Sequence, residues 1–128
     1  MLIIKPIVAP RFLKLLSKIN GFGISGFFFF PFIFINRPEP SVMDNDHRVW
    51  RKTVRHESIH WQQCVETLII GFLLIYGGHY LLLRLNGKDH EAAYRGVVFE
   101  REAYTNQWDE IYHKRRVWFA WLACFNDC

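Results

Sequence analysis

Two histidines four residues apart, His56 and His60, with Glu57 between them, restrict the local fold more than any other feature of this sequence. On an α-helix, residues i and i+4 lie on one face, so both imidazole rings can bind a single zinc ion. In metal-dependent hydrolysis, a glutamate next to the first histidine accepts a proton from a zinc-activated water. The motif therefore requires a helix, and it predicts His56 and His60 as zinc ligands and Glu57 as the general base.

The flanking sequence supports a helix around this motif. Residues 50–66 contain neither glycine nor proline, and Ser41, Asp44 and Asp46 are candidate N-terminal caps. Pro38-Glu39-Pro40 ends the element that precedes them. The alternative interpretation is a charged helix face on which the two histidines are merely solvated.

A catalytic zinc site usually has three protein ligands and one open position. The best candidate for the third ligand is Glu100, in a second stretch without helix breakers, residues 99–104. Ala103, one turn later, would let this second helix approach the first one closely. Glu102 is the alternative ligand, but it cannot share a helix face with Glu100 and is more simply a solvated or ion-paired surface residue. Glu66 is a weaker alternative, because it lies on the same helix as the two histidines.

Together, the two motifs resemble a known class of enzymes. His56-Glu57-x-x-His60 followed at a distance by Glu100-x-x-Ala103 is similar to the gluzincin class of zinc metallopeptidases. The similarity is greatest to the branch whose second helix carries a glutamate, then an alanine, then an aspartate. It covers the two helices that carry the motifs, which make up well under half of the chain.

The resemblance implies a ligand set and a general base. His56, His60 and Glu100 would hold one zinc ion, and Glu57 would be the general base. The sequence departs from the family at Tyr104, where the family has an aspartate that orients a zinc-ligating histidine. The connection between the two helices is also short for that branch.

The composition predicts one domain with more apolar surface than it can bury. The chain has 128 residues, of which 51% are hydrophobic, including 12 phenylalanines. A domain this small has a high surface-to-volume ratio, so part of this apolar surface must stay exposed to solvent, lipid or a partner. The excess lies in residues 27–35, 68–83 and 117–125.

Residues 27–35 are almost entirely aromatic or β-branched, and they predict a strand before the first motif. Pro31 within this stretch fits only an edge strand or a bulge. In gluzincins the edge of such a strand pairs with the extended backbone of the substrate, which is strand addition. The alternative is a segment that dips into a membrane, because nine residues are too few to span one as a helix.

Residues 68–83 carry no formal charge and are close to the minimum length of a spanning helix. Three structures fit them: a spanning helix, a buried core helix broken at Gly77-Gly78, or a hairpin lying in the membrane interface. Arg84 and Lys88 would anchor the far end. In residues 11–19, basic side chains alternate with leucine and phenylalanine, which is typical of an amphipathic helix on an anionic leaflet.

We therefore expect a mainly α-helical single domain, residues 1–128, with a short β element and apolar, membrane-associated helices. Its centre would be a minimal zincin-like core of two packed helices, one with each motif, and an edge strand or hairpin before the first. The expected segments are a basic amphipathic region (1–20), a strand or hairpin (24–35), the zinc helix and an apolar helix (44–85), and the glutamate helix and an aromatic C-terminal helix (90–125).

The charge pattern favours contact with a membrane over contact with nucleic acid, and the cysteine pattern favours a reducing compartment. Acidic residues are interspersed with the 16 Lys and Arg, so no broad basic face favours nucleic acid. Cys64, Cys124 and Cys128 are odd in number and lack Cys-x-x-Cys spacing, so we expect no disulfide framework. The wider pattern, with Gln62-Gln63 and Tyr94-Arg95, resembles small bacterial proteins. The expected location is the bacterial inner membrane, with the site on the cytoplasmic side.

The predicted function is that of a zinc-dependent metallopeptidase acting on a peptide or protein substrate. Tyr94, Tyr104 and His113 are candidates to stabilise the oxyanion of the tetrahedral intermediate. Two alternatives stay open. One is a non-catalytic module in which zinc staples two helices of a small membrane-associated domain. The other is a membrane interaction protein without metal.

Overall fold

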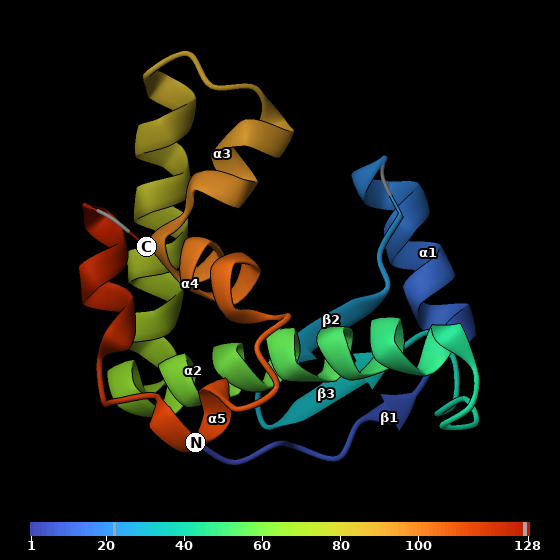
Figure 1. Ribbon diagram of the computed structural model, residues 1–128. Coiled ribbons are helices and arrows are strands. Elements are labelled where there is room, and N and C mark those ends of the chain that lie inside the picture. Colours follow the sequence, from blue (N-terminus) through green and yellow to red (C-terminus); the bar gives the residue numbers. More distant parts are fainter. Residues whose placement is uncertain (22, 127) are drawn as a thin grey trace.

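The computed structural model describes residues 1–21, 23–126 and 128, and it is mainly helical with one small sheet (Figure 1). This is the fold class that the sequence predicted. The elements in chain order are β1 (Ile7–Val8), α1 (Pro10–Asn20), β2 (Gly26–Phe29), β3 (Phe32–Ile35), α2 (Asn45–Leu85), α3 (His90–Gly96), α4 (Val98–Asn106), α5 (Tyr112–Arg115) and the 3-10 helix η1 (Ala120–Phe125).

The aromatic stretch before the first motif forms a β-hairpin. β2 and β3 pair antiparallel, and β1 adds to the other side of β3 in parallel, so the order is β1-β3-β2. Pro31 lies in the turn after a cis peptide bond, and not in a strand as the prediction of an edge strand or bulge required. The hairpin itself was one of the two expected forms. β2 is thus an edge strand of this sheet.

α2 is interrupted by a sharp bend at Leu68, whose φ of 58° and ψ of 165° are not helical (Figure 1). We call residues 45–67 the motif helix and residues 69–85 the apolar helix. Asp44, one of the three candidate caps, is the N-cap and accepts a hydrogen bond from the Asp46 N–H at 3.0 Å. The helix continues through Gly77-Gly78, so the structure shows neither the break at that position nor the hairpin, which were two of the three alternatives.

The apolar helix is largely exposed. Within the described residues, α2 is the one helix long and apolar enough to cross a membrane, and 6% of its most apolar window is buried. A buried core helix would show the opposite, so that alternative fits the structure poorly. The exposed large side chains of this region are Leu68, Ile69, Ile70, Leu73, Leu74, Leu81, Leu82 and Leu85.

α4 packs against the motif helix, as the alanine in the second motif predicted. Ala103 and Ile59 are fully buried in the same cluster. One turn before Ala103 on α4, Phe99 stacks on Phe72 of the apolar helix and meets Trp121 of η1 edge to face. These contacts fix α4 between the two halves of α2.

Two further expectations concern the N-terminal helix and the cysteines. α1 is the expected amphipathic helix, with Leu13 buried and Leu15 exposed. Cys124 and Cys128 form a disulfide, contrary to the expectation from their number and spacing, whereas Cys64 is a buried free thiol.

Candidate metal centre

His56, His60 and Glu100 meet in one buried cluster. One ligand atom from each lies within 4.8 Å of the others. The Nε2 atoms of the two histidines are 3.1 Å apart, and the Glu100 carboxylate oxygens lie 3.2 Å from His56 Nε2 and 3.3 Å from His60 Nε2. All three residues are buried. The structure therefore brings together the three predicted zinc ligands.

Helix geometry explains why these side chains converge. His56 and His60 lie one turn apart on the motif helix and face α4. Glu100 is in the first turn of α4, and the absence of a large side chain at Ala103 lets the two helices approach each other. Glu57 is rotated by about 100° from His56 around the helix axis, so it points toward β2 instead.

Gln63 determines which nitrogen of His60 carries a proton. Its amide nitrogen donates to the Phe99 carbonyl (3.0 Å) and to Glu102 Oε2 (2.9 Å). Both of these groups are acceptors, so the orientation of the amide is fixed and its oxygen must accept from His60 Nδ1, 2.8 Å away. His60 Nε2 is then the nitrogen with a free lone pair for a metal ion.

Gln107 makes the corresponding contact with His56. Its side-chain oxygen lies 3.2 Å from His56 Nδ1, and its backbone carbonyl accepts from Arg55 at 2.6 Å. Each histidine thus has a glutamine side chain at its Nδ1 atom. Tyr104 instead packs edge to face on the His56 ring, with centroids 4.8 Å apart.

The electrostatics of the cluster favour a cation. Burial alone would raise the pKa of the Glu100 carboxyl, but the neighbouring His60 and His56 rings hold that pKa well below its usual range. Burial likewise lowers the pKa of His60, yet the Glu100 carboxylate outweighs it and raises the pKa to about 9. The three side chains together therefore bind positive charge, as a proton when no metal ion is present.

The hydrogen bonds of Glu100 fit a metal ion as well. Tyr76 of the apolar helix donates its hydroxyl to Glu100 Oε1 at 2.8 Å. Within residues 1–21, 23–126 and 128, Oε2 is buried and accepts no well-aligned hydrogen bond, and its polar neighbour is His56 Nε2, 3.2 Å away. A buried carboxylate oxygen without a donor is costly, and a bound cation between it and the two imidazoles would satisfy it. Tyr76 could not be singled out from the sequence, because it belongs to no motif and lies within the uncharged segment 68–83.

Glu57 lies at the boundary between the centre and two cavities. A Cβ at Gly26 of β2 would be 2.7 Å from Glu57 Oε1, so the carboxylate lies directly against the edge strand. Burial raises the pKa of Glu57, and the His56 ring opposes this shift. Glu57 is thus close to the histidines but outside the ligand set, where a general base is expected.

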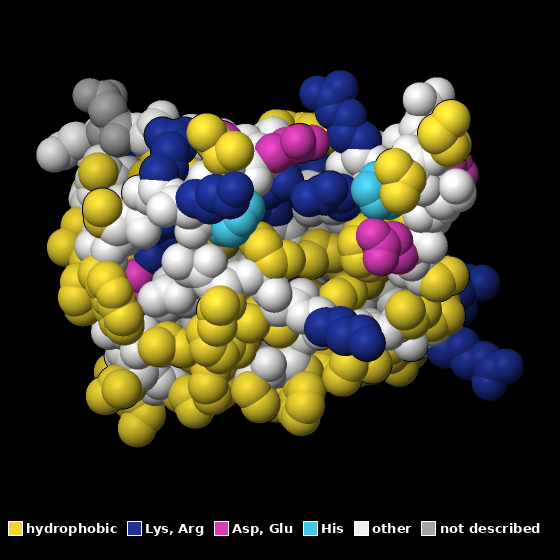
Figure 2. All heavy atoms as spheres, turned by 60° about the horizontal axis from the view of Figure 1, so that its bottom comes forward, with side chains coloured by type: hydrophobic (Ala, Val, Ile, Leu, Met, Phe, Trp, Pro, Cys, Tyr) yellow, Lys and Arg dark blue, Asp and Glu magenta, His cyan; other side chains and the backbone are white. Residues whose placement is uncertain are grey.

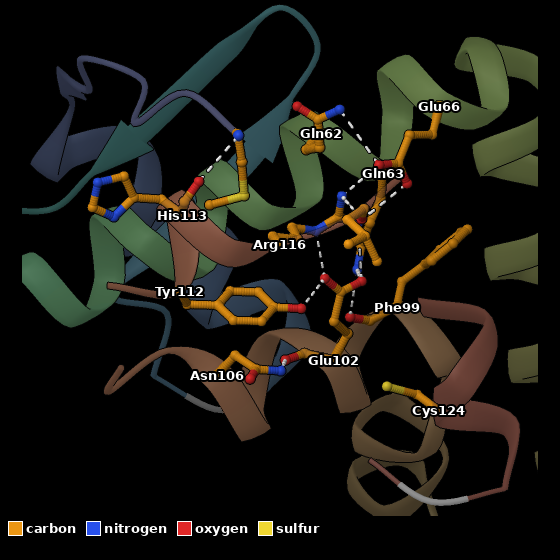
Figure 3. Close-up of polar contacts among 12 residues, drawn as sticks. Gln62, Gln63, Glu66, Phe99, Glu102, Asn106, Tyr112, His113, Arg116 and Cys124 are labelled. Atoms are coloured by element: carbon orange, nitrogen blue, oxygen red, sulfur yellow. Dashed lines mark hydrogen bonds and ion pairs between the residues drawn. The ribbon is translucent and has the colours of Figure 1, made fainter. Parts of the chain in front are cut away.

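The alternative ligands Glu102 and Glu66 lie away from the cluster, and both bind Arg116 (Figure 3). Arg116 Nε is 2.6 Å from Glu102 Oε1, and the Tyr112 hydroxyl donates to the same oxygen at 2.8 Å. Glu102 is 1% exposed, so the prediction of an ion-paired residue was right and that of a surface residue was wrong. The two carboxylates raise the pKa of Arg116 despite its burial.

Of the three oxyanion candidates, the structure places two near the centre. Tyr94 lines both cavities beside Glu57, and burial together with the Glu100 carboxylate raises its pKa. Tyr104 contacts His56, as described above. His113 lines a different cavity, with Ile3 and Trp50, and lies outside the centre.

No protein-family model, no curated protein and no solved structure matches this chain. The resemblance to gluzincins therefore stays a prediction, and the geometry of the centre is the basis for assigning a function.

Proposed function

We propose that this protein is a zinc-dependent peptidase whose metal is held by His56, His60 and Glu100. The observation that carries the proposal is the convergence of two imidazole lone pairs and one carboxylate in a buried cluster. Catalytic zinc sites have three protein ligands with nitrogen or oxygen donors, and their fourth position is open for water or substrate. When bound, zinc supplies Lewis-acid chemistry, which polarises a peptide carbonyl and makes water acidic at neutral pH.

Glu57 acts as the general base. Its carboxylate accepts the proton of the attacking water and returns it to the nitrogen of the leaving amine. Burial supports this role, because the raised pKa makes Glu57 a stronger base than an exposed glutamate. Gln63 and Gln107 orient the two histidine rings, so that both Nε2 atoms face the metal position.

The free edge of β2 binds the substrate backbone. Asn36 donates its N–H to the Ser25 carbonyl, and hydrogen-bonded pairs alternate along an antiparallel ladder. The N–H and C=O groups of Gly26 and Phe28 therefore point away from β3, into the free edge of the sheet, while Glu57 lies against the face of the strand at Gly26. An extended peptide added to this edge would pass beside the general base, because Gly26 and Glu57 line the same two cavities.

We further propose that the protein associates with a membrane, as expected for a bacterial inner-membrane protein with its site on the cytoplasmic side. The exposed apolar helix and the exposed aromatic residues around η1, Trp118, Phe119 and Phe125, support lipid contact. In Figure 2 hydrophobic side chains cover much of the lower part of the face, and Lys and Arg are more frequent above them. This separation suits an anionic lipid surface.

A non-catalytic zinc module is the second candidate. The burial of all three ligands supports it, since His56 is 6%, His60 4% and Glu100 2% exposed. Zinc would then staple the motif helix to α4, and a small domain gains stability from such a staple. The two candidates differ in the role of Glu57, which only a peptidase requires.

Two carboxylate-to-amide variants test the proposal. Detergent-purified wild type should contain about one zinc per chain, and Glu100→Gln should lose it. Glu57→Gln should keep its zinc but lose hydrolysis of a casein or peptide-library substrate, by a factor of about 10² to 10⁴. Far-ultraviolet circular dichroism controls for folding. Wild type without zinc would overturn both candidates, and full zinc without hydrolysis in the wild type would leave only the zinc module.

A further inference from the structure

Two cavities meet at the proposed catalytic centre. Ile24, Gly26, Glu57 and Tyr94 line both of them, so the general base lies at their junction. One cavity extends along residues 23–26, at the start of β2, and the other along residues 26–29, toward its end. A chain that follows the free edge of β2 therefore passes from one cavity into the other.

The two cavities differ in chemistry. The first has a volume of about 250 Å³ and is lined by charged and amide side chains, including Lys52, Arg95 and Gln107. The second has a volume of about 480 Å³ and lies between β2 and the apolar helix. Its walls include Phe28, Phe29, Phe72, Leu73 and Gly77. We call these the polar cavity and the apolar cavity.

The apolar cavity is large enough for a bulky side chain. An apolar cavity of about 150 Å³ already binds benzene in another protein. The wall formed by Phe72 and Leu73 belongs to the apolar helix, directly after the bend at Leu68, so this bend is what places an apolar wall beside the metal centre. His60 is in the same lining, which puts an occupant next to the metal ligands.

We propose that the substrate is a polypeptide with a bulky apolar side chain beside the cleaved bond, and that this side chain occupies the apolar cavity. The proposal rests on the peptidase function. Antiparallel addition to β2 places the amino-terminal part of the substrate at the Phe28–Phe29 end of the strand. The apolar residue then precedes the cleaved bond, and polar residues follow it in the polar cavity.

Two neighbouring glycines of the apolar helix provide a matched test. Gly77 lines the apolar cavity, whereas Gly78 does not. Apart from chain neighbours and the backbone of the same helix, no described atom lies within 4 Å of a Cβ built at either position. Gly77→Leu would fill the cavity, and Gly78→Leu makes the same change one residue away. Both changes raise helix propensity, so neither is expected to unfold the helix.

The experiment measures binding separately from hydrolysis. Both glycine variants are made in the Glu57→Gln background, loaded with zinc, and titrated in detergent with two fluorescein-labelled peptides of Ser, Thr and Gln. These peptides differ at one central position, which is Phe in one and Asp in the other. We expect the Phe peptide to bind the parent at least tenfold more tightly, and Gly77→Leu to weaken its binding about tenfold to a hundredfold. Gly78→Leu should bind like the parent.

The outcomes separate the two proposals. Equal binding of the Phe and Asp peptides, or equal effects of the two glycine variants, would overturn the apolar substrate class, even if the wild type hydrolyses peptides. Binding that depends on Phe and on Gly77, in a protein whose wild type hydrolyses nothing, would support the apolar binding site and overturn the peptidase. In an active wild type, mass spectrometry of library products should show apolar residues before the cleaved bond.

Discussion

Two buried glutamates on α4, Glu100 and Glu102, lie two residues apart and have different surroundings. Both are almost fully buried, and each accepts a hydrogen bond from a tyrosine hydroxyl at 2.8 Å, from Tyr76 and Tyr112 respectively. Glu102 also binds a guanidinium that belongs to the chain, Arg116 (Figure 3). Glu100 faces two histidines, whose charge depends on a proton or a metal ion.

This difference separates a structural ion pair from a candidate binding site. A buried carboxylate needs a positive partner, because desolvation of an unpaired charge costs several kcal/mol. At Glu102 the partner is permanent, since a guanidinium does not lose its proton in proteins. At Glu100 the partner can be exchanged, and Oε2 accepts no well-aligned hydrogen bond from any residue that the structure describes. An exchangeable partner is what a metal site requires.

The largest expected effect comes from removing the permanent partner. Arg116→Met leaves Glu66 and Glu102 buried without a cation, and we expect the free energy of unfolding to fall by about 3–5 kcal/mol. Urea denaturation in detergent, followed by circular dichroism, measures this change. Arg115→Met is the control, because the exposed Arg115 pairs with Asp109 and lies over the Tyr112 ring, so its loss removes no cation from Glu66 or Glu102. Similar effects of the two variants would contradict the contrast between the two glutamates.

The second effect tests the exchangeable partner. Zinc at a hundred times its dissociation constant should stabilise the wild type by about 2.7 kcal/mol relative to chelator-treated protein. Glu100→Gln should lose this difference, yet in chelator it should be within about 1 kcal/mol of the wild type, because the histidines can shed their proton and become neutral. If Glu100→Gln in chelator lowered the free energy of unfolding as much as Arg116→Met does, Glu100 would be a structural residue.

The third effect concerns Gln63, which contacts both clusters. It binds His60 through its oxygen and Glu102 through its nitrogen. Gln63→Leu should weaken zinc binding about tenfold to a hundredfold, because His60 loses the acceptor that orients its ring. Isothermal titration calorimetry measures the affinity. Gln62→Leu is the matched control, since the side chain of Gln62 bonds to Glu66 at 3.4 Å and, among the described residues, to no histidine. The affinity of this variant for zinc should equal that of the wild type.

The features of the two sites that follow from helix periodicity could be predicted from the sequence. The positions of His56, His60 and Glu57 follow from the helix alone, and Ala103 indicated which face of the second helix approaches the first. The hairpin in residues 24–35 could be predicted for a similar reason, because its composition and its proline are local signals.

The other features of the two sites depend on contacts between residues that are far apart in the sequence. Arg116 is 50 residues from Glu66, and Gln107 is 51 from His56, so no periodic pattern connects them. The bend at Leu68 gives no sequence signal either, because Leu rarely adopts a positive φ and the glycines nearby suggested a different position. Tertiary packing decides these features, and the burial of Glu102 was not predicted because Arg116 could not be identified as its partner.

We expect the smallest effects from removing the hydroxyl groups of the two tyrosines that bind the glutamates. Tyr112→Phe should reduce the free energy of unfolding by about 1 kcal/mol with or without zinc, since Glu102 keeps Arg116 and Gln63 as partners. Tyr76→Phe should cost about 1.5 kcal/mol in chelator and less than half of that with zinc, because a bound cation compensates the Glu100 oxygen for the lost donor. Urea denaturation of both variants, with zinc and with chelator, measures the four values. If Tyr76→Phe lowered the free energy of unfolding equally with zinc and with chelator, no cation would reach Glu100. The two glutamates would then differ only in how they are packed.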